Sequence, residues 1–274
     1  MRAGSVELVL ARAWSAVVRV PVAEGVVWFK ESPPELGFEP ALTALLARRR
    51  PERLPQVIAV EGRRMLTRDA GPRLRAHLDE GGTGAPAWPE LLALEAELQI
   101  GFAGDADAAL SLGTPDARPA LLPELAAALP GGDSRVDAAR RAVEGLREAI
   151  PVTVVHTEAH DGNLFIREGH VRVLDWAEAV VSHPFVGIVL PLRFAVERTG
   201  STAEELRDAY LEPFTRFAPM PELREDFAHG YLLGALVRAL TWHWLGADEP
   251  EDPTTAWLEI FDGIADGTIT LGEA

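Results

Sequence analysis

The polar segment His156-Thr157-Glu158-Ala159-His160-Asp161-Gly162-Asn163 follows the apolar stretch Val152–Val155 and precedes a second apolar stretch at Leu164–Ile166. A third stretch, Val171–Leu174, lies beyond the turn sequence Arg167-Glu168-Gly169-His170. Two short apolar stretches around a glycine-containing turn predict a β-hairpin. Polar side chains that could carry chemistry therefore gather where this hairpin begins.

Two oxygen ligands flank the predicted hairpin. Asn163 precedes the first strand, and Asp175, which Trp176 follows, comes directly after the second. A hairpin brings the ends of its strands together, so an amide oxygen and a carboxylate are expected side by side. Such oxygens suit a hard cation, and Mg²⁺ is the natural occupant. Phosphoryl transfer needs a cation of this kind, together with groups that position an acceptor hydroxyl and neutralise phosphates.

The first third of the chain has the alternating pattern of short strands, and one helix is predicted at Phe38–Arg49, where Pro51 and Pro55 close it off. We expect an antiparallel sheet with the strands Val6–Leu10, Ala16–Val20, Val26–Lys30, Gln56–Val60 and Arg64–Thr67. Strand patterns end near residue 69, which divides the chain into residues 1–69 and 70–274. Together the two parts predict an α+β fold.

The remainder of the chain is mainly helical in pattern. Ser134 and Thr202 are predicted N-caps, the latter with Glu205 in a capping box. Apolar residues three or four apart predict long helices at Pro89–Phe102, Ser134–Ile150, Thr202–Phe217 and Glu222–Leu245.

Composition excludes several classes of function. A formal net charge of −16 argues against nucleic acid or an anionic membrane as the partner, and fits a cationic small molecule. The absence of cysteine excludes disulfides, thiolate metal sites and thiol nucleophiles. The sequence Met1–Trp14 has no signal-peptide pattern, and no apolar stretch reaches the roughly 20 residues that span a bilayer. A cytoplasmic location is expected, and the oligomeric state stays open.

The central segment resembles the aminoglycoside phosphotransferase and choline kinase group. That family has a His-x-Asp-x-x-x-x-Asn catalytic loop, a hairpin and an Asp-Trp metal-binding element, which His156, Asn163 and Asp175-Trp176 match. The likeness continues through Ala179 to His183-Pro184-Phe185. It implies a two-lobed, protein-kinase-like fold, with a small antiparallel-sheet N-lobe at residues 1–69 and a larger helical C-lobe at residues 70–274. It also implies ATP and Mg²⁺ as cofactors, with Asn163 and Asp175 as the metal ligands.

The resemblance extends less specifically over the N-terminal third. Val26–Lys30 looks like the third strand of a kinase N-lobe, which implies that Lys30 contacts the nucleotide phosphates and that Glu39 is its ion-pair partner. Trp14-Ser15 stands where the family has its phosphate-covering loop, but the glycine pattern of kinases is missing there. The stretch Leu66–Gly71 would be the hinge that contacts adenine.

One departure from the family pattern concerns the catalytic group. Glu158 stands where the family has the aspartate that orients the acceptor hydroxyl, while His156 is expected to support the loop by hydrogen bonding. One extra methylene moves a carboxylate by about 1.5 Å, and a misplacement of about 1 Å can cost on the order of a hundredfold in rate. Three interpretations stay open: Glu158 is the base of a reshaped site, activity is low, or the fold serves another purpose.

The leading hypothesis is an ATP-dependent phosphotransferase acting on a hydroxyl of a small molecule: an antibiotic, aminoglycoside, sugar or amino alcohol. One alternative is a pseudokinase or partner subunit of a biosynthetic complex. Another is non-phosphoryl chemistry with Glu158 as general base. The aromatic helix Tyr231–Leu245, which includes Arg238, is expected to pack in the core or cover the acceptor. The acidic pairs Glu204-Glu205 and Glu225-Asp226 are expected to be solvated, or to bind ammonium groups as in aminoglycoside-modifying relatives.

Overall fold

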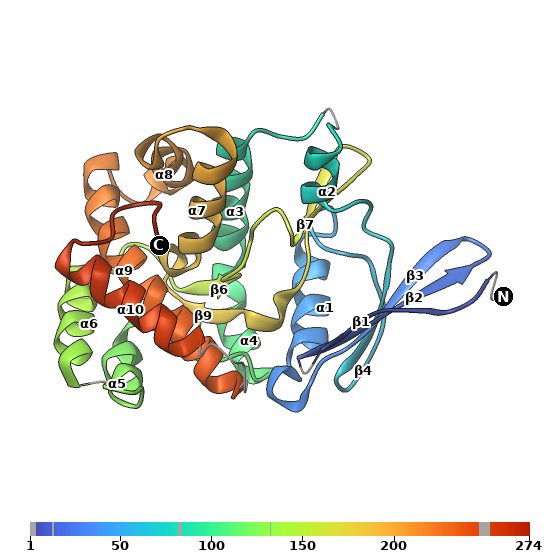
Figure 1. Ribbon diagram of the computed structural model, residues 1–274, viewed down its shortest axis with the longest axis horizontal. Helices are drawn as coiled ribbons and strands as arrows, with labels where there is room; N and C mark the ends of the chain where they lie inside the picture. Colours follow the sequence, from blue (N-terminus) through green and yellow to red (C-terminus); the bar gives the residue numbers. More distant parts are fainter. Residues whose placement is uncertain (1–3, 13, 82–83, 132, 247–252) are drawn as a thin grey trace. The chain divides into compact units, whose positions relative to one another are not determined.

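The computed structural model describes residues 4–12, 14–81, 84–131, 133–246 and 253–274. The chain forms two compact units, each described by itself below (Figure 1). The first comprises Met1–Ala85, Ser111–Thr114 and Asp161–Glu178, and the second comprises Pro86–Leu110, Pro115–His160 and Ala179–Ala274. The predicted boundary after residue 69 stays a prediction.

The first unit contains a five-stranded antiparallel sheet in the order β1-β2-β3-β5-β4. Its strands are β1 (Glu7–Arg12), β2 (Ser15–Val22), β3 (Gly25–Glu31), β4 (Val57–Glu61) and β5 (Arg64–Arg68). Two glycines with positive φ stand at the hairpins of this sheet: Gly25, at 121°, begins β3, and Gly62, at 55°, lies between β4 and β5. Glycine adopts such conformations at no steric cost. The expected N-terminal antiparallel sheet is confirmed.

Two helices and a hairpin complete the first unit. The helices are α1 (Glu39–Arg49) and α2 (Leu74–Asp79), and the hairpin consists of β7 (Leu164–Arg167) and β8 (His170–Val173). Glu168 and Gly169 both have positive φ, 55° and 78°, as a two-residue hairpin turn of right-handed strand twist requires. The predicted hairpin is confirmed.

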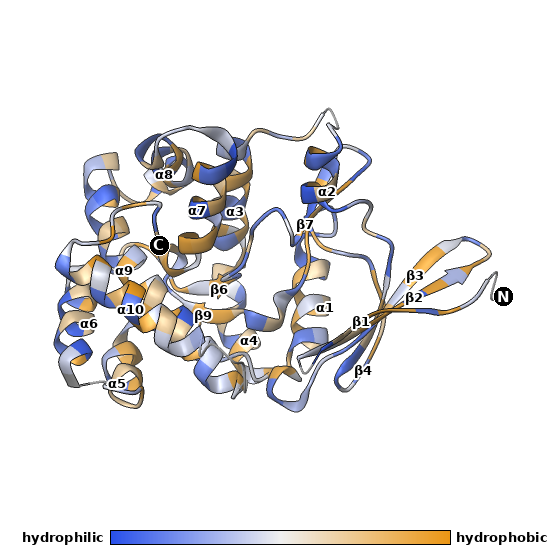
Figure 2. Cartoon of the chain, viewed as in Figure 1, coloured by the Kyte–Doolittle hydropathy of each residue, from blue (hydrophilic) through white to orange (hydrophobic). Residues whose placement is uncertain are grey.

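The second unit is mainly helical, with a small antiparallel pair of strands, β6 (Thr153–Val155) and β9 (Val180–Ser182). α10 packs along α9, α8 packs against α3, and α5 packs against α6. Figure 2 shows that α3 is largely hydrophobic, whereas α6 carries more hydrophilic residues. The helices are α3 (Trp88–Phe102), α4 (Ala106–Ser111), α5 (Leu122–Ala127), α6 (Asp133–Gly145), α7 (Val189–Thr199), α8 (Ala203–Leu211), α9 (Met220–Leu245) and α10 (Pro253–Asp266).

Several predicted element ends are wrong. α6 stops at Gly145 rather than at Ile150, and Ser134 lies inside this helix, where its hydroxyl donates to the Gly131 carbonyl instead of capping the helix. α8 stops at Leu211 and continues as a 3₁₀ segment, because Pro213 lacks the amide that an α-helix needs. Thr202 does cap α8, in a capping box with Glu205, as predicted.

The core of the second unit places α9 directly on the 3₁₀ segment η5 (Pro184–Ile188). A Cβ at Gly230 would lie 2.4 Å from Cβ of Phe185, and one at Gly234 would lie 2.6 Å from the Val186 carbonyl oxygen. Glycine is therefore required at both positions for this close approach. Among the described residues, no helix has both the length and the apolar character that a membrane crossing requires.

Candidate active site

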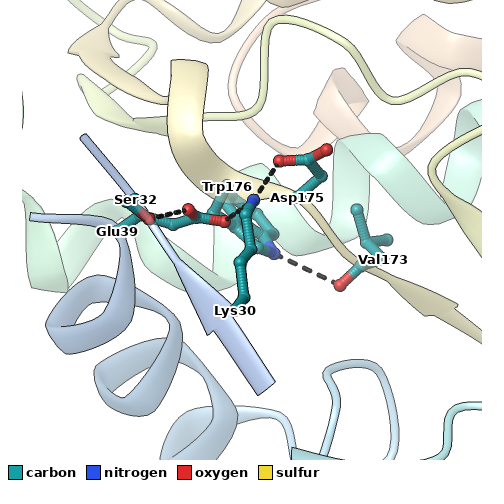
Figure 3. A network of polar contacts seen from close by, with 6 residues as sticks. All are labelled: Lys30, Ser32, Glu39, Val173, Asp175 and Trp176. Carbon is teal, nitrogen blue, oxygen red and sulfur yellow. Dashed lines mark hydrogen bonds and ion pairs between the residues drawn. The ribbon is translucent and has the colours of Figure 1, made fainter. Parts of the chain in front are cut away.

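The polar centre of the first unit is Lys30, which projects from β3 and bridges two carboxylates (Figure 3). Its Nζ donates to Oε1 of Glu39 on α1 and to Oδ1 of Asp175, at 2.6 Å in each case. The hydroxyl of Ser32 donates to the other Glu39 oxygen, Oε2, at 2.7 Å. The Lys30 ammonium thus joins β3 to the nearby helix α1 and to Asp175, which lies 145 positions further along the chain.

The three charged groups differ strongly in exposure. The Glu39 side chain is 0% exposed, that of Lys30 is 13% exposed and that of Asp175 is 50% exposed. Burial acts to lower the pKa of Lys30, but Asp175 and Glu39 outweigh it, so the pKa of this ammonium lies above its ordinary value. Lys30 is a permanent cation, with a buried carboxylate on one side and an accessible one on the other.

The backbone of the hairpin determines where Asp175 lies. Asp175 has a φ of 67°, a left-handed conformation that costs on the order of 1 kcal/mol for residues other than glycine and often marks a functional position. The preceding amide, Leu174 N, donates to the Asn163 carbonyl oxygen at 2.9 Å. Nearby, the Trp176 indole donates to the Val173 carbonyl (Figure 3). The predicted pair of oxygen ligands, Asn163 and Asp175, is therefore tied together at the open end of the hairpin.

The donor set at this position fits Mg²⁺. Within the described part of the chain, no group of three or more His, Asp or Glu side chains converges as in an all-protein metal site. Mg²⁺ is commonly bound through one or two carboxylates plus substrate phosphates and water. One exposed carboxylate from Asp175 and one amide oxygen from Asn163 suit that mode of binding.

Asp161 anchors the loop that leads to Asn163. Its fully buried carboxylate oxygen Oδ1 accepts two hydrogen bonds from Arg75 on α2, from Nε at 2.9 Å and from Nη2 at 2.7 Å. Backbone contacts add to this, because the Arg75 amide donates to the Asp161 carbonyl at 3.0 Å. Sequence reasoning gave no role to either residue.

Ser15 lies at the turn between β1 and β2 and is buried. Val17, two residues further along β2, pairs with Lys30 on β3, so Ser15 and Lys30 share one face of the sheet. Among the described residues, the Ser15 hydroxyl oxygen has no hydrogen-bond partner. A buried hydroxyl in this position can donate to an oxygen-rich ligand on the same face, which fits the phosphate-covering loop that the resemblance places at Trp14-Ser15.

In the second unit, Glu158 is held by an arginine. The Glu158 carboxylate oxygen Oε1 accepts from Nη2 of Arg238 on α9 at 2.8 Å. The Glu158 amide donates to Nδ1 of the buried His156 at 3.1 Å. The expected supporting role of His156 stays a prediction. His160 lies against the ring of Phe194, with 4.7 Å between the ring centroids.

The helix α9 contributes Arg238 to this loop. Arg238 stands inside the apolar run Leu236–Leu240, and a lone charge in such a run signals a buried partner. That signal could have identified Arg238 from the sequence. The acidic pair at Glu225-Asp226 is not fully solvated as expected, because Asp226 is buried and accepts from Arg147.

Comparison with known proteins places these residues in a family context. A model of the phosphotransferase enzyme family matches residues 6–232. An ethanolamine kinase from Plasmodium vivax has 9% identity and a TM-score of 0.63, over 97% of this chain and 84% of that one. A putative fructosamine-3-kinase from Thermobifida fusca has 19% identity and a TM-score of 0.58, over 96% and 92% of the two chains.

A third similar structure is that of amicoumacin kinase in complex with AMP-PNP and Ca²⁺, with 14% identity and a TM-score of 0.59, over 96% and 88% of the two chains. At these identities the likeness shows the fold alone, and it confirms the expected kinase-like fold with an N-terminal antiparallel sheet and a helical C-terminal region. No curated protein sequence matches the chain.

Proposed function

The chain belongs to the phosphotransferase enzyme family, and from that premise we propose that it transfers the γ-phosphoryl group of ATP to a hydroxyl of a small molecule, with Mg²⁺. The observation that carries the proposal is the Lys30 ammonium, held at 2.6 Å from both the buried Glu39 and the accessible Asp175. A fixed cation beside an exposed carboxylate is the arrangement that phosphate and metal binding require.

Each of the site residues described in the first unit has a role in this proposal. Lys30 neutralises phosphate oxygens, Glu39 keeps its ammonium in place, and the Ser15 hydroxyl donates to a phosphate. Asn163 and Asp175 would hold Mg²⁺, which supplies charge neutralisation at the phosphates when bound. Amicoumacin kinase, which shares this fold, forms a complex with AMP-PNP and Ca²⁺, and this supports the use of a nucleotide and a divalent cation here.

The acceptor step is assigned to Glu158. Its carboxylate accepts the proton of the acceptor hydroxyl while the acceptor oxygen bonds to the γ-phosphorus. The bond from that phosphorus to the oxygen bridging the β- and γ-phosphates breaks, and ADP leaves with the electron pair. His156 does not take part in this step directly. Its ring nitrogen accepts a hydrogen bond from the Glu158 amide and so helps to position the loop that carries Glu158.

The first experiment is isothermal titration of the purified protein with ATP and with GTP, each with and without Mg²⁺. It is repeated with Asp175→Asn and with the control Arg135→Met, which breaks an arginine–carboxylate pair to Asp262 in the second unit. We expect Mg²⁺-dependent binding that weakens at least tenfold in Asp175→Asn and is unchanged in the control.

Binding of neither nucleotide would overturn the proposal, as would equal affinity in wild type and Asp175→Asn. Turnover is then followed as ADP release and product mass in an acceptor panel of amino alcohols, sugars and aminoglycosides, with water as the reference acceptor. A product heavier by one phosphoryl group is expected. Loss of water from the acceptor without a phosphorylated product would identify the alternative chemistry with Glu158 as general base.

A further inference from the structure

Arg238 is a charged residue in an unusually apolar position. It lies on α9 between Val237 and Ala239, and its side chain is only 3% exposed. Burying a guanidinium is unfavourable unless its donors are well paired, because the charge loses its hydration. A hydrophobic side chain would fit the same run of the helix without that cost, so the charge at this position calls for a reason other than packing.

Three groups fix the guanidinium. Nη1 donates to Oγ1 of Thr157 at 3.1 Å, and Nη2 donates to Oε1 of Glu158 at 2.8 Å. The ring of Trp257 on α10 covers the same group, with 5.5 Å between the guanidinium carbon and the ring centroid. Arg238 therefore contacts two consecutive residues of the loop and lies over an aromatic ring, an arrangement that attracts a cation.

The contact with Arg238 restricts the side chain of Glu158, the glutamate that stands where the family has an aspartate. Compared with aspartate, glutamate has one more rotatable bond, and fixing a flexible side chain costs conformational entropy. A rigid fork that holds one carboxylate oxygen removes that freedom. The Glu158 side chain is still 22% exposed, so its carboxylate remains accessible to a small molecule while it is held.

We propose that Arg238 is a positioning residue that fixes the Glu158 carboxylate for the acceptor hydroxyl, with Trp257 holding Arg238 in turn. The inference rests on the proposed phosphotransfer, in which Glu158 receives the proton. It explains how a longer side chain serves at this position: the carboxylate is located by the fork on α9 rather than by a short side chain.

The test compares ADP release from MgATP, with the acceptor panel and with water, for wild type and four variants: Arg238→Met, Arg238→Lys, Glu158→Asp and the matched control Arg135→Met. Arg135 likewise pairs with a carboxylate in the second unit, that of Asp262, which it contacts through two nitrogens. We expect kcat to fall on the order of a hundredfold in Arg238→Met, with the KM for MgATP within about twofold of wild type.

The other variants sharpen the comparison. Arg238→Lys keeps the charge but loses the fork, so an intermediate kcat is expected. Glu158→Asp restores the family's usual residue, yet it withdraws the carboxylate from Arg238 and is expected to be slower than wild type by tenfold or more. Wild-type kcat in Arg238→Met, or faster turnover in Glu158→Asp, would overturn the inference.

Amide hydrogen exchange over residues 153–160 gives a readout that does not depend on turnover. Loss of the contacts to Thr157 and Glu158 is expected to accelerate exchange at least tenfold in Arg238→Met and to leave it unchanged in Arg135→Met. If the wild type releases no ADP with any acceptor, the proposed function fails, and this measurement still decides about Arg238. Equal exchange in wild type and Arg238→Met would refute a positioning role.

Discussion

Lys30 forms ion pairs with two carboxylates that differ in their exposure to solvent. Glu39 is fully buried, whereas half of the Asp175 side chain is exposed. Burial raises the pKa of Glu39 above its ordinary value, while the Lys30 ammonium and the Ser32 hydroxyl oppose that rise. The pair with Glu39 therefore matters to the stability of the first unit, and the pair with Asp175 matters mainly to ligand binding.

Substitution of Lys30 separates these two pairs. Lys30→Met leaves the buried Glu39 carboxylate without its cation, so we expect a loss of roughly 3 kcal/mol in the free energy of unfolding. Asp175→Asn keeps the buried pair and removes only an exposed charge, so a change below about 1 kcal/mol is expected. Urea unfolding measures the free energy of unfolding of both variants. If Lys30→Met were as stable as the wild type, this account would be contradicted.

Whether the sequence could predict a residue's role depended on whether that role is local. Asn163 and Asp175 could be paired from the sequence because a hairpin of four-residue strands joins them. The contacts of Arg75 with Asp161 and of Arg238 with Glu158 join residues 86 and 80 positions apart. No turn or helical period relates such residues, so only the folded chain reveals them.

The elements around the hairpin are joined by a backbone contact that permits no side chain. Gly71 follows β5, has a φ of 97°, and a Cβ there would lie 2.1 Å from the Ile166 carbonyl oxygen on β7. The Ile166 amide in turn donates to the Pro72 carbonyl at 3.0 Å. The predicted hinge at Leu66–Gly71 thus runs directly into a segment that supports the proposed metal ligands.

Gly71→Ala is expected to destabilise the first unit and to weaken MgATP binding, because the strand β7 must move away from residue 71. Gly25→Ala is the matched control, since Gly25 has a φ of 121° but open space around its Cβ position. Both variants carry conformational strain of about 1–2 kcal/mol. Only Gly71→Ala adds the clash, so equal MgATP affinities in the two variants would contradict the proposed role of this contact.

Element ends were harder to predict than elements. The strands of the N-terminal sheet were predicted because alternating apolar residues and glycine turns agree there. The sequence does not predict β9, because three residues are too few for a periodic pattern. Its partner strand, β6, also lies 25 residues away along the chain. The end of α6 was placed too late because apolar spacing continues to Ile150 beyond the last helical hydrogen bonds.

At the scale of the whole molecule, His183 links folding to pH. It is buried in the second unit, where its Nδ1 accepts the Phe185 amide at 3.3 Å and its ring lies edge-on to Phe185. Among the described residues its Nε2 has no hydrogen-bond partner. Burial lowers the pKa of His183 to about 3, from an ordinary value of 6.5, so the folded chain keeps this ring neutral.

The sign of the effect on stability follows from this depressed pKa. Below pH 6.5 the unfolded chain binds a proton at His183 that the folded chain does not bind, so the contribution of this ring to stability is present above pH 6.5 and is lost as the pH falls towards 3. Between pH 7.5 and pH 5.5 the loss from this one group is on the order of 1 kcal/mol.

His183→Asn tests that contribution. An asparagine keeps an acceptor for the Phe185 amide but does not titrate, so the variant is expected to lose on the order of 1 kcal/mol less stability than the wild type when the pH falls from 7.5 to 5.5. Its absolute stability falls at both pH values, because contact with the Phe185 ring is lost, and only the difference between the two pH values is diagnostic. The control His243→Asn removes an exposed imidazole on α9. Denaturant unfolding at both pH values measures the effect, and a pH dependence in His183→Asn equal to that of the wild type would mean that His183 becomes protonated in the folded chain.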